Sequence, residues 1–181
     1  MNIIVTGAAG FIGSHTCLVL LEKGHNVVAL DSFENSSPKS LERVLEIYRI
    51  NSNNQMHNLK IFKGNLCDKS FVKEVFKSLL SANKNIDGVI HFAGLKSVAE
   101  SIINPLIYWE TNVLGTINLL DTMMEFNCEN IVFSSSATVY KQKLGKLLKE
   151  NCKVGPINPY GNTKLTIELI LKDVFKSSPK F

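Results

Sequence analysis

A tyrosine and a lysine stand four residues apart near the C-terminal end of the sequence, in the segment NPYGNTK (158–164). Asn158 suits a helix N-cap and Pro159 suits the first helical turn, so Tyr160 and Lys164 would lie on one face of a helix. A lysine ammonium beside a phenol favours the phenolate, the form that acts as a general base. The pair therefore predicts proton transfer, with an amphipathic helix of no catalytic role as the alternative.

Three glycines, Gly7, Gly10 and Gly13, recur at a spacing of three between an apolar run (3–5) and a helical pattern. A dinucleotide pyrophosphate needs backbone N–H groups at a helix N-terminus with no side chains in its way, and glycine meets both needs. We therefore interpret this segment as a pyrophosphate-binding loop. The alternative is a tight strand-to-helix turn that binds no ligand.

An acidic residue follows at the position that such a loop requires. Asp31 ends the second apolar run, 18 positions after Gly13, where its carboxylate can accept both ribose hydroxyls of an adenosine. That carboxylate would repel a 2′-phosphate, and positions 32–37 contain no Lys or Arg that could bind one. The sequence therefore favours NAD over NADP, with a surface aspartate at a strand end as the alternative.

A run of serines follows the fifth predicted strand, in the segment FSSSATVY (133–140). Ligands of parallel α/β sheets bind at the carboxyl ends of the strands. Ser136 is therefore expected to hydrogen-bond a substrate hydroxyl. Serines in a polar turn without a ligand are the alternative.

Apolar runs and helical periods alternate along the chain, which predicts a doubly wound parallel sheet with helices on both faces, a three-layer α/β fold. The pattern predicts no boundary inside residues 1–181, and an exposed loop at 141–153. The expected strands are 3–5, 27–30, 59–62, 88–92 and 131–134, and the expected helices are 11–23, 41–50, 71–80, 106–126 and 159–176.

Composition excludes several classes of protein. The 181 residues are 45% hydrophobic and 20% charged, enough for a packed core and unlike a disordered chain. The net charge of +4 is spread along the sequence, and only Arg43 and Arg49 are arginine, which disfavours nucleic-acid binding. No apolar stretch is long enough to cross a membrane.

The four cysteines, Cys17, Cys67, Cys128 and Cys152, lie far apart with no CxxC pair. This spacing predicts no metal site and suits reduced thiols in a cytoplasmic protein.

Taken together, the segments TGAAGFIGSHT (6–16), FAGLKSV (92–98), SSSATVY (134–140) and PYGNTK (159–164) closely resemble the UDP-glucose 4-epimerases. These belong to the extended short-chain dehydrogenase/reductase family, and the resemblance runs from residue 2 to about residue 176. Related sugar-nucleotide dehydratases typically carry an acidic Thr-Asp-Glu run where this chain has Ser-Ala-Thr (136–138). The implied fold is the NAD-binding Rossmann type.

The resemblance also implies roles for individual residues. Tyr160 would be the catalytic base, Lys164 would hold the nicotinamide ribose and tune the tyrosine, and Ser136 would bind the sugar 4-hydroxyl. The substrates would be UDP-glucose and UDP-galactose, interconverted through a 4-keto sugar on a permanently bound NAD. The whole stretches 31–36 and 92–96 would line the NAD site. The residues individually implied for that site are Gly7, Gly10, Phe11, Ile12, Gly13, Asp31, Ser32, Phe33, Asn35, Ser36, Asn65, Leu66, Phe92, Ala93, Gly94, Lys96, Thr111, Tyr160 and Lys164.

The chain departs from the family pattern at three positions. Asn65 stands where an aspartate usually contacts the adenine amino group, Thr111 stands where asparagine is common, and Lys141 replaces a glycine. Enzymes of the family are also nearly twice as long. We therefore expect the last strands and the small UDP-binding domain to lie outside these 181 residues.

The resemblance further implies a homodimer that forms through the helices at 106–126 and 159–176. Two other functions remain consistent with the sequence. The chain could act on a different nucleotide sugar, as another epimerase or dehydratase of the extended family, or it could be an NAD-binding remnant without catalysis.

Overall fold

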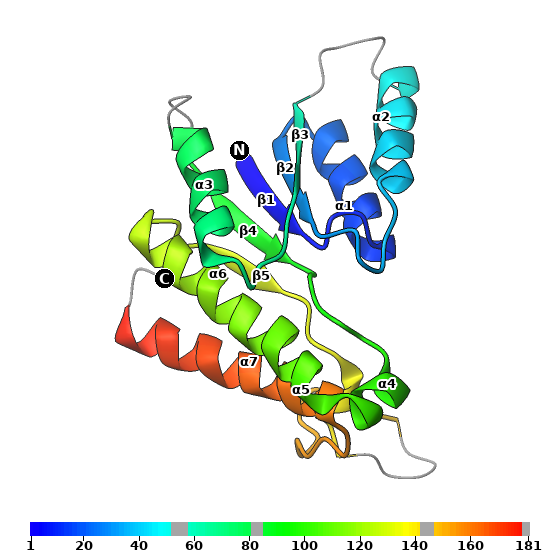
Figure 1. Ribbon diagram of the computed structural model, residues 1–181, viewed down its shortest axis with the longest axis vertical. Helices are drawn as coiled ribbons and strands as arrows, with labels where there is room; N and C mark the ends of the chain where they lie inside the picture. Colours follow the sequence, from blue (N-terminus) through cyan, green and yellow to red (C-terminus); the bar gives the residue numbers. More distant parts are fainter. Residues whose placement is uncertain (52–57, 81–84, 142–146, 179–181) are drawn as a thin grey trace.

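Five parallel strands form one sheet in the computed structural model, which describes residues 1–51, 58–80, 85–141 and 147–178 (Figure 1). The central strand β1 pairs with β2 on one side and β4 on the other, so that Val5 lies opposite Ala29 and Ile90. The strand order is β3-β2-β1-β4-β5, with bounds Asn2–Thr6 (β1), Asn26–Asp31 (β2), Leu59–Lys63 (β3), Gly88–His91 (β4) and Ile131–Phe133 (β5).

The strand order reverses between β1 and β4. Chain segments leave these two strands in opposite directions, which opens a crevice at their carboxyl ends. The predicted parallel sheet is confirmed, and the crevice is the place where such sheets bind ligands.

Helices cover both faces of the sheet (Figure 1). One core packs α1 (Phe11–Glu22) and α2 (Lys39–Asn51) against Val5 and its neighbours. The other core, around Ile4, packs α3 (Lys69–Leu80), α6 (Gly115–Glu125) and α7 (Pro159–Ser177). Because successive strand residues point to opposite faces, strands β1 to β4 contribute side chains to both cores. The predicted three-layer arrangement is therefore confirmed.

The helix predicted at 106–126 consists of three pieces. Pro105–Tyr108 is α5, Trp109–Leu114 is a π-helical turn, and α6 follows from Gly115. A further short helix, α4 (Val98–Ile103), precedes them and was not predicted. A π-turn contains one extra residue for its hydrogen bonds, so no regular apolar period indicates it.

The loop predicted at 141–153 is only partly described, since residues 142–146 lie outside the described residues. An antiparallel bridge between Tyr140 and Val154 closes its base, directly after a 3₁₀ turn at Ala137–Val139. The Asn-rich composition of residues 51–58 also predicts a loop, and most of it, residues 52–57, lies outside the described residues. In the described part of the chain, no helix has the length and apolar character that a membrane span requires.

Candidate active site

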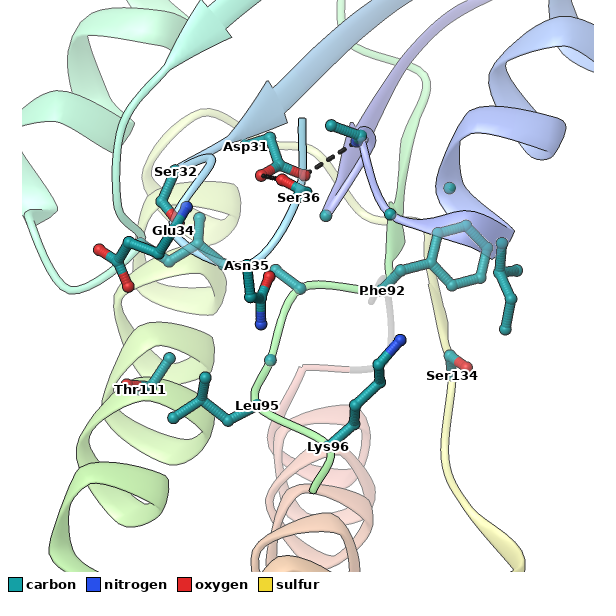
Figure 2. A pocket seen from close by; sticks show the side chains of 18 of the residues that line it. Asp31, Ser32, Glu34, Asn35, Ser36, Phe92, Leu95, Lys96, Thr111 and Ser134 are labelled. Carbon is teal, nitrogen blue, oxygen red and sulfur yellow. Dashed lines mark hydrogen bonds between the residues drawn. The ribbon is translucent and has the colours of Figure 1, made fainter. Parts of the chain in front are cut away.

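A cavity of about 430 Å³ lies at the carboxyl ends of the strands, bounded by the segments that follow all five strands and by the start of α7 (Figure 2). Its size is in the range of small-molecule and cofactor sites. Most of the residues predicted for the site line it: Gly7, Gly10, Phe11, Ile12, Gly13, Asp31, Ser32, Asn35, Ser36, Asn65, Leu66, Phe92, Ala93, Gly94, Lys96, Thr111, Tyr160 and Lys164.

Two predicted residues, Phe33 and Ser136, are not among those that line the cavity. Phe33 adopts a left-handed backbone conformation (φ 60°) and packs against the core formed by α1 and α2. Ser136 begins the 3₁₀ turn, where its hydroxyl oxygen accepts bonds from the backbone N–H and the hydroxyl of Thr138.

Sequence reasoning missed several residues that line the cavity. Gly64, Ser134 and Ser135 directly follow strands, and this position alone could have indicated them. The others are Ala9 and Leu30, which are neighbours in sequence of predicted residues. For these two, only the turn geometry decides whether the residue faces the cavity. Glu34 and Leu95 also line the cavity, inside the stretches 31–36 and 92–96 that were expected to do so.

The glycine loop has no room for side chains. A Cβ on Gly7, whose φ is +63°, would lie 2.7 Å from the backbone nitrogen of Ala93. A Cβ on Gly13 would fall onto the carbonyl oxygen of Gly7 and lie 2.9 Å from the Cα of Ala8. Gly10 begins α1 without a side-chain cap, so the first helical N–H groups remain available to an anion, as a pyrophosphate site requires.

Asp31 joins the glycine loop to the segment that follows β2. Its buried carboxylate accepts the backbone N–H of Ala9 on Oδ2 (2.8 Å), and on Oδ1 it accepts the N–H of Phe33 (2.9 Å) and the hydroxyl of Ser36 (2.7 Å) (Figure 2). A carboxylate has about four lone-pair sites, so Oδ2 keeps one for a ligand hydroxyl. Asp31 therefore both shapes the cavity and faces it.

The start of α7 follows the predicted pattern. The side-chain oxygen of Asn158 accepts the backbone N–H of Gly161 (2.8 Å), and Pro159 occupies the first helical turn. Tyr160 lies in this first turn and Lys164 lies one turn later. Both side chains are buried and both line the cavity. Gly161 permits this because a Cβ there would lie 2.8 Å from the carbonyl oxygen of Thr138.

Two side chains of α7 hold the serine run that follows β5. The Lys164 ammonium donates to the carbonyl of Ser134 (2.9 Å) and lies 4.6 Å from the centre of the Phe133 ring. Ser135 donates its hydroxyl to the carboxylate of Glu168. Burial lowers the pKa of Lys164 to about 8, because the charged form loses its hydration. The lysine therefore releases its proton at a lower pH than an exposed lysine does.

A chain of buried hydrogen bonds passes through His91 at the end of β4. The Thr116 hydroxyl donates to the carbonyl of Asn112, so its oxygen can accept the proton of His91 Nε2 (2.9 Å). His91 Nδ1 then accepts the Thr6 hydroxyl (2.7 Å), whose oxygen accepts the N–H of Ala93 (3.2 Å). Burial, and secondarily the charge of Lys164, lowers the pKa of His91 to about 3, so the imidazole is neutral.

Asn112, in the π-turn, links the segment after β4 to α7. Its side chain accepts the N–H of Leu95 (2.7 Å) and donates to the Leu95 carbonyl (3.0 Å) and to the Thr163 hydroxyl (3.1 Å). Thr163 in turn donates to the carbonyl of Tyr160 (2.7 Å). The turn that breaks the helical period thus fixes the tyrosine relative to the cavity wall.

The cavity therefore combines two kinds of chemistry. Carboxylate acceptors and a helix N-terminus line one part, and a tyrosine beside a desolvated lysine lines another. Such a site can bind an anionic nucleotide and can take a proton from a hydroxyl. Among the residues that the structure describes, no three His, Cys, Asp or Glu side chains gather in a way that could hold a metal ion.

A family model and curated proteins match nearly the whole length of this chain. A family model described as GDP-mannose 4,6 dehydratase matches residues 4–180. The chain is 44% identical over 180 residues to a UDP-glucose 4-epimerase of Pisum sativum and 45% identical over 182 residues to one of Yersinia enterocolitica. These matches cover 99% and 100% of this chain, but 49% and 51% of the relatives. The chain thus spans about half the length of the curated relatives it matches.

Solved structures share the fold. A UDP-glucose 4-epimerase from Bifidobacterium longum, in complex with NAD+ and UDP, superposes with a TM-score of 0.87 at 42% identity, covering 99% of this chain and 50% of that chain. One from Stenotrophomonas maltophila, with bound NAD and formylated UDP-arabinopyranose, gives 0.86 at 37% identity, covering 98% and 49%. The sheet described above is therefore the fold of the matching part of these proteins.

Proposed function

Because the chain belongs to the family that the GDP-mannose 4,6 dehydratase model describes, within the extended short-chain dehydrogenases/reductases, we propose that residues 1–181 are the NAD-binding domain of a UDP-glucose 4-epimerase. One observation carries the proposal: Tyr160 and Lys164 line the same cavity as the glycine loop and Asp31. The serine run after β5, in place of an acidic run, favours an epimerase over a dehydratase.

The residues of the cavity fit NAD. A Cβ on Gly7 or Gly13 would meet the protein's own backbone, so the tight loop depends on glycine at both positions. The uncapped start of α1 suits a pyrophosphate. Asp31 keeps an acceptor for a ribose hydroxyl, and the segment after it contains no cation for a 2′-phosphate. When bound, NAD supplies the group that accepts a hydride from a sugar carbon and returns it.

The protein side chains supply the proton chemistry. We assign Tyr160 as the base that takes the proton of the sugar 4-hydroxyl, with Lys164 as the adjacent cation and as the residue that binds the nicotinamide ribose. Ser136 binds the sugar hydroxyl in this proposal. Its oxygen already accepts two bonds from Thr138, so its own proton remains available to a substrate oxygen.

Calorimetric titration of the 181-residue chain tests the cofactor. We expect NAD to bind and NADP to bind at least about tenfold more weakly, because a 2′-phosphate would meet the carboxylate of Asp31. Asp31→Ala should weaken NAD binding, whereas Tyr160→Phe should leave it nearly unchanged. Equal NAD affinity in Asp31→Ala and the unaltered chain would remove Asp31 from the site.

Conversion of UDP-galactose to UDP-glucose tests the activity. Tyr160→Phe should abolish any conversion that the unaltered chain catalyses, because the general base is lost. Conversion that survives in this variant would refute the role of Tyr160. NAD binding without any conversion of a nucleotide sugar would instead support a domain that binds the cofactor without catalysis by itself.

The proposal includes a homodimer that forms through the helices at 106–126 and 159–176. Large apolar side chains are exposed along both, among them Leu106, Ile117 and Phe175. Exposed apolar side chains on adjacent helices favour association. Sedimentation should show a dimer that Ile117→Glu weakens, and a monomer at all concentrations would contradict this part of the proposal.

We also propose a cytoplasmic location. All four cysteines of the chain are free thiols, and two of them, Cys17 and Cys128, are buried. Free, widely separated cysteines are typical of a reducing compartment. Labelling of thiols in freshly broken cells should find these cysteines reduced.

A further inference from the structure

Glu34 lies at the end of the cavity formed by the segments after β2 and β3, within the stretch 31–36, and the sequence analysis gives this residue no individual role. It lines the cavity together with Ser32 and Asn35 of the same segment (Figure 2). Its side chain is exposed, so a ligand could reach it.

A bond from Asn65 fixes the orientation of the Glu34 carboxylate. The oxygen of the Asn65 side chain accepts the backbone N–H of Cys67 (2.9 Å), so its NH₂ group points the other way and donates to Glu34 Oε1 (3.1 Å). The Asn65 amide therefore presents only its NH₂ group to Glu34. This bond holds one carboxylate oxygen of Glu34 and leaves the other for a ligand.

The backbone that carries Glu34 is also held in place. Asp31 accepts the N–H of Phe33, and the ring of Phe33 packs against the core. The left-handed conformation of Phe33 costs energy that a bulky residue normally avoids. This strain is maintained by the packing around it, so the carboxylate of Glu34 projects from a rigid turn.

The topology determines which part of the ligand reaches Glu34, if the proposed function holds. A dinucleotide in this fold places its pyrophosphate at the glycine loop after β1 and one ribose at Asp31 after β2. The nicotinamide must lie toward Tyr160, on the far side of β1. The base attached to the ribose at Asp31 therefore extends over β2 and β3, where Glu34 and Asn65 line the cavity.

We propose that Glu34 determines the specificity of this site for the base, by accepting a hydrogen bond from the exocyclic amino group of adenine. An ionised carboxylate only accepts hydrogen bonds, so it discriminates between an amino group and a carbonyl at the same position. Hypoxanthine differs from adenine by this replacement and would bring a carbonyl oxygen against the carboxylate. The inference rests on the proposed binding of NAD and adds to it the group that recognises the base.

Calorimetric titration of the 181-residue chain with NAD and with nicotinamide hypoxanthine dinucleotide tests the proposal. The unaltered chain should bind NAD about tenfold more tightly or better, as expected for a hydrogen bond to a charged group. In Glu34→Gln the amide can turn its NH₂ toward a carbonyl, so the ratio of the two affinities should fall to about twofold. Glu34→Ala should also lose the preference, mainly through weaker NAD binding.

Glu42→Gln is the matched control, since it removes the same charge from an exposed position in the first turn of α2. It should keep the affinity ratio of the unaltered chain. A Glu34→Gln variant that keeps this ratio would overturn the proposal while NAD binding stands. Failure of the unaltered chain to bind either dinucleotide would overturn the proposed function and the inference together. Because Glu34 is exposed, thermal unfolding of its variants should be unchanged.

Discussion

The two ends of the cavity are built from opposite kinds of groups. At the β2–β3 end, Asp31 ends β2 and Glu34 lies in the segment that follows, and their carboxylates accept bonds from backbone and amide N–H groups. At the β5–α7 end, Lys164 of α7 lines the cavity and is buried. His91, the last residue of β4, does not line the cavity, and it is buried beside the ring of Phe133 of β5.

The difference follows from what each end must do in the proposed function. Ribose hydroxyls and an adenine amino group are donors, so a binding end needs acceptors held in fixed positions. Proton transfer needs groups whose pKa lies near the working pH, and burial of a cation lowers its pKa toward that range. Burial lowers the pKa of Lys164 to about 8. In the proposed function, the β2–β3 end therefore binds the ligand through carboxylates that hydrogen bonds hold in place. The β5–α7 end supports proton transfer through a buried lysine.

The largest expected effect comes from the glycine loop, on which both ends depend. Gly13→Ala should cost about 4 kcal/mol or more of unfolding free energy, because the new methyl group overlaps backbone atoms that cannot move aside. Gly10→Ala is the control, since its Cβ would lie 3.2 Å from the Gly7 carbonyl oxygen and should cost about 1 kcal/mol. Urea unfolding measures both. Equal losses would show that the crowding is not specific to Gly13.

The next effect tests the neutral histidine of the β5–α7 end. The pKa of His91 is about 3 in the folded state, against 6.5 for an ordinary histidine, so between these values the unfolded chain binds the extra proton. Stability should therefore fall as the pH decreases from about 6.5 toward 3, by about 3 kcal/mol at pH 4. Urea unfolding at several pH values should show this loss.

His91→Gln should lack most of the acid-dependent loss, whereas His15→Gln, at an exposed position, should retain it. A His91→Gln variant with the full pH dependence would show that other groups cause the acid sensitivity.

Lys164, at the same end, should change the stability of the protein in the alkaline pH range. The folded-state pKa of Lys164 is about 8 against a reference of 10.5, so above pH 8 the unfolded chain keeps a proton that the folded chain releases. The cost of burying the cation is complete below pH 8 and disappears by about pH 10.5. The unfolding free energy should therefore rise by about 2 kcal/mol between pH 8 and 10, relative to Lys164→Met. Parallel pH curves for the two proteins would contradict this prediction.

The smallest effect concerns the carboxylate of the β2–β3 end. Ser36→Ala removes one of the three donors to Asp31 and should cost about 1 kcal/mol of stability, with a loss of NAD affinity of only a few-fold. Thermal unfolding and calorimetry measure the two effects. Ser70→Ala, at an exposed position in the first turn of α3, should change neither. An effect of Ser36→Ala larger than that of either buried base would invalidate the contrast between the two ends.

Sequence reasoning predicted the features whose causes are local. Apolar runs predicted all five strands, glycine spacing predicted the loop, and the capping of α7 by Asn158 followed from its type and position. The π-turn was missed because its cause is distant: Asn112 bonds Leu95 and Thr163, far from it in sequence.

The candidate site shows the same limit. Consecutive residues of a turn point in different directions, which is why Phe33 faces the core while Glu34 lines the cavity. The bond between Asn65 and Glu34 joins residues 31 positions apart, and nothing in either local sequence predicts it. Ser136, likewise, engages Thr138, whereas Ser134 and Ser135 line the cavity.

The π-turn at Trp109–Leu114 restricts how this part of the chain can change in length. Removing one residue from it would restore ordinary α-helical bonding, but it would rotate everything before the turn by about 100° relative to α6. Tyr108, fully buried, would then leave its place beside Tyr160. Single-residue deletions should therefore destabilise the fold far more here than in the surface loops, although the π-turn contains one residue more than an α-helical turn needs.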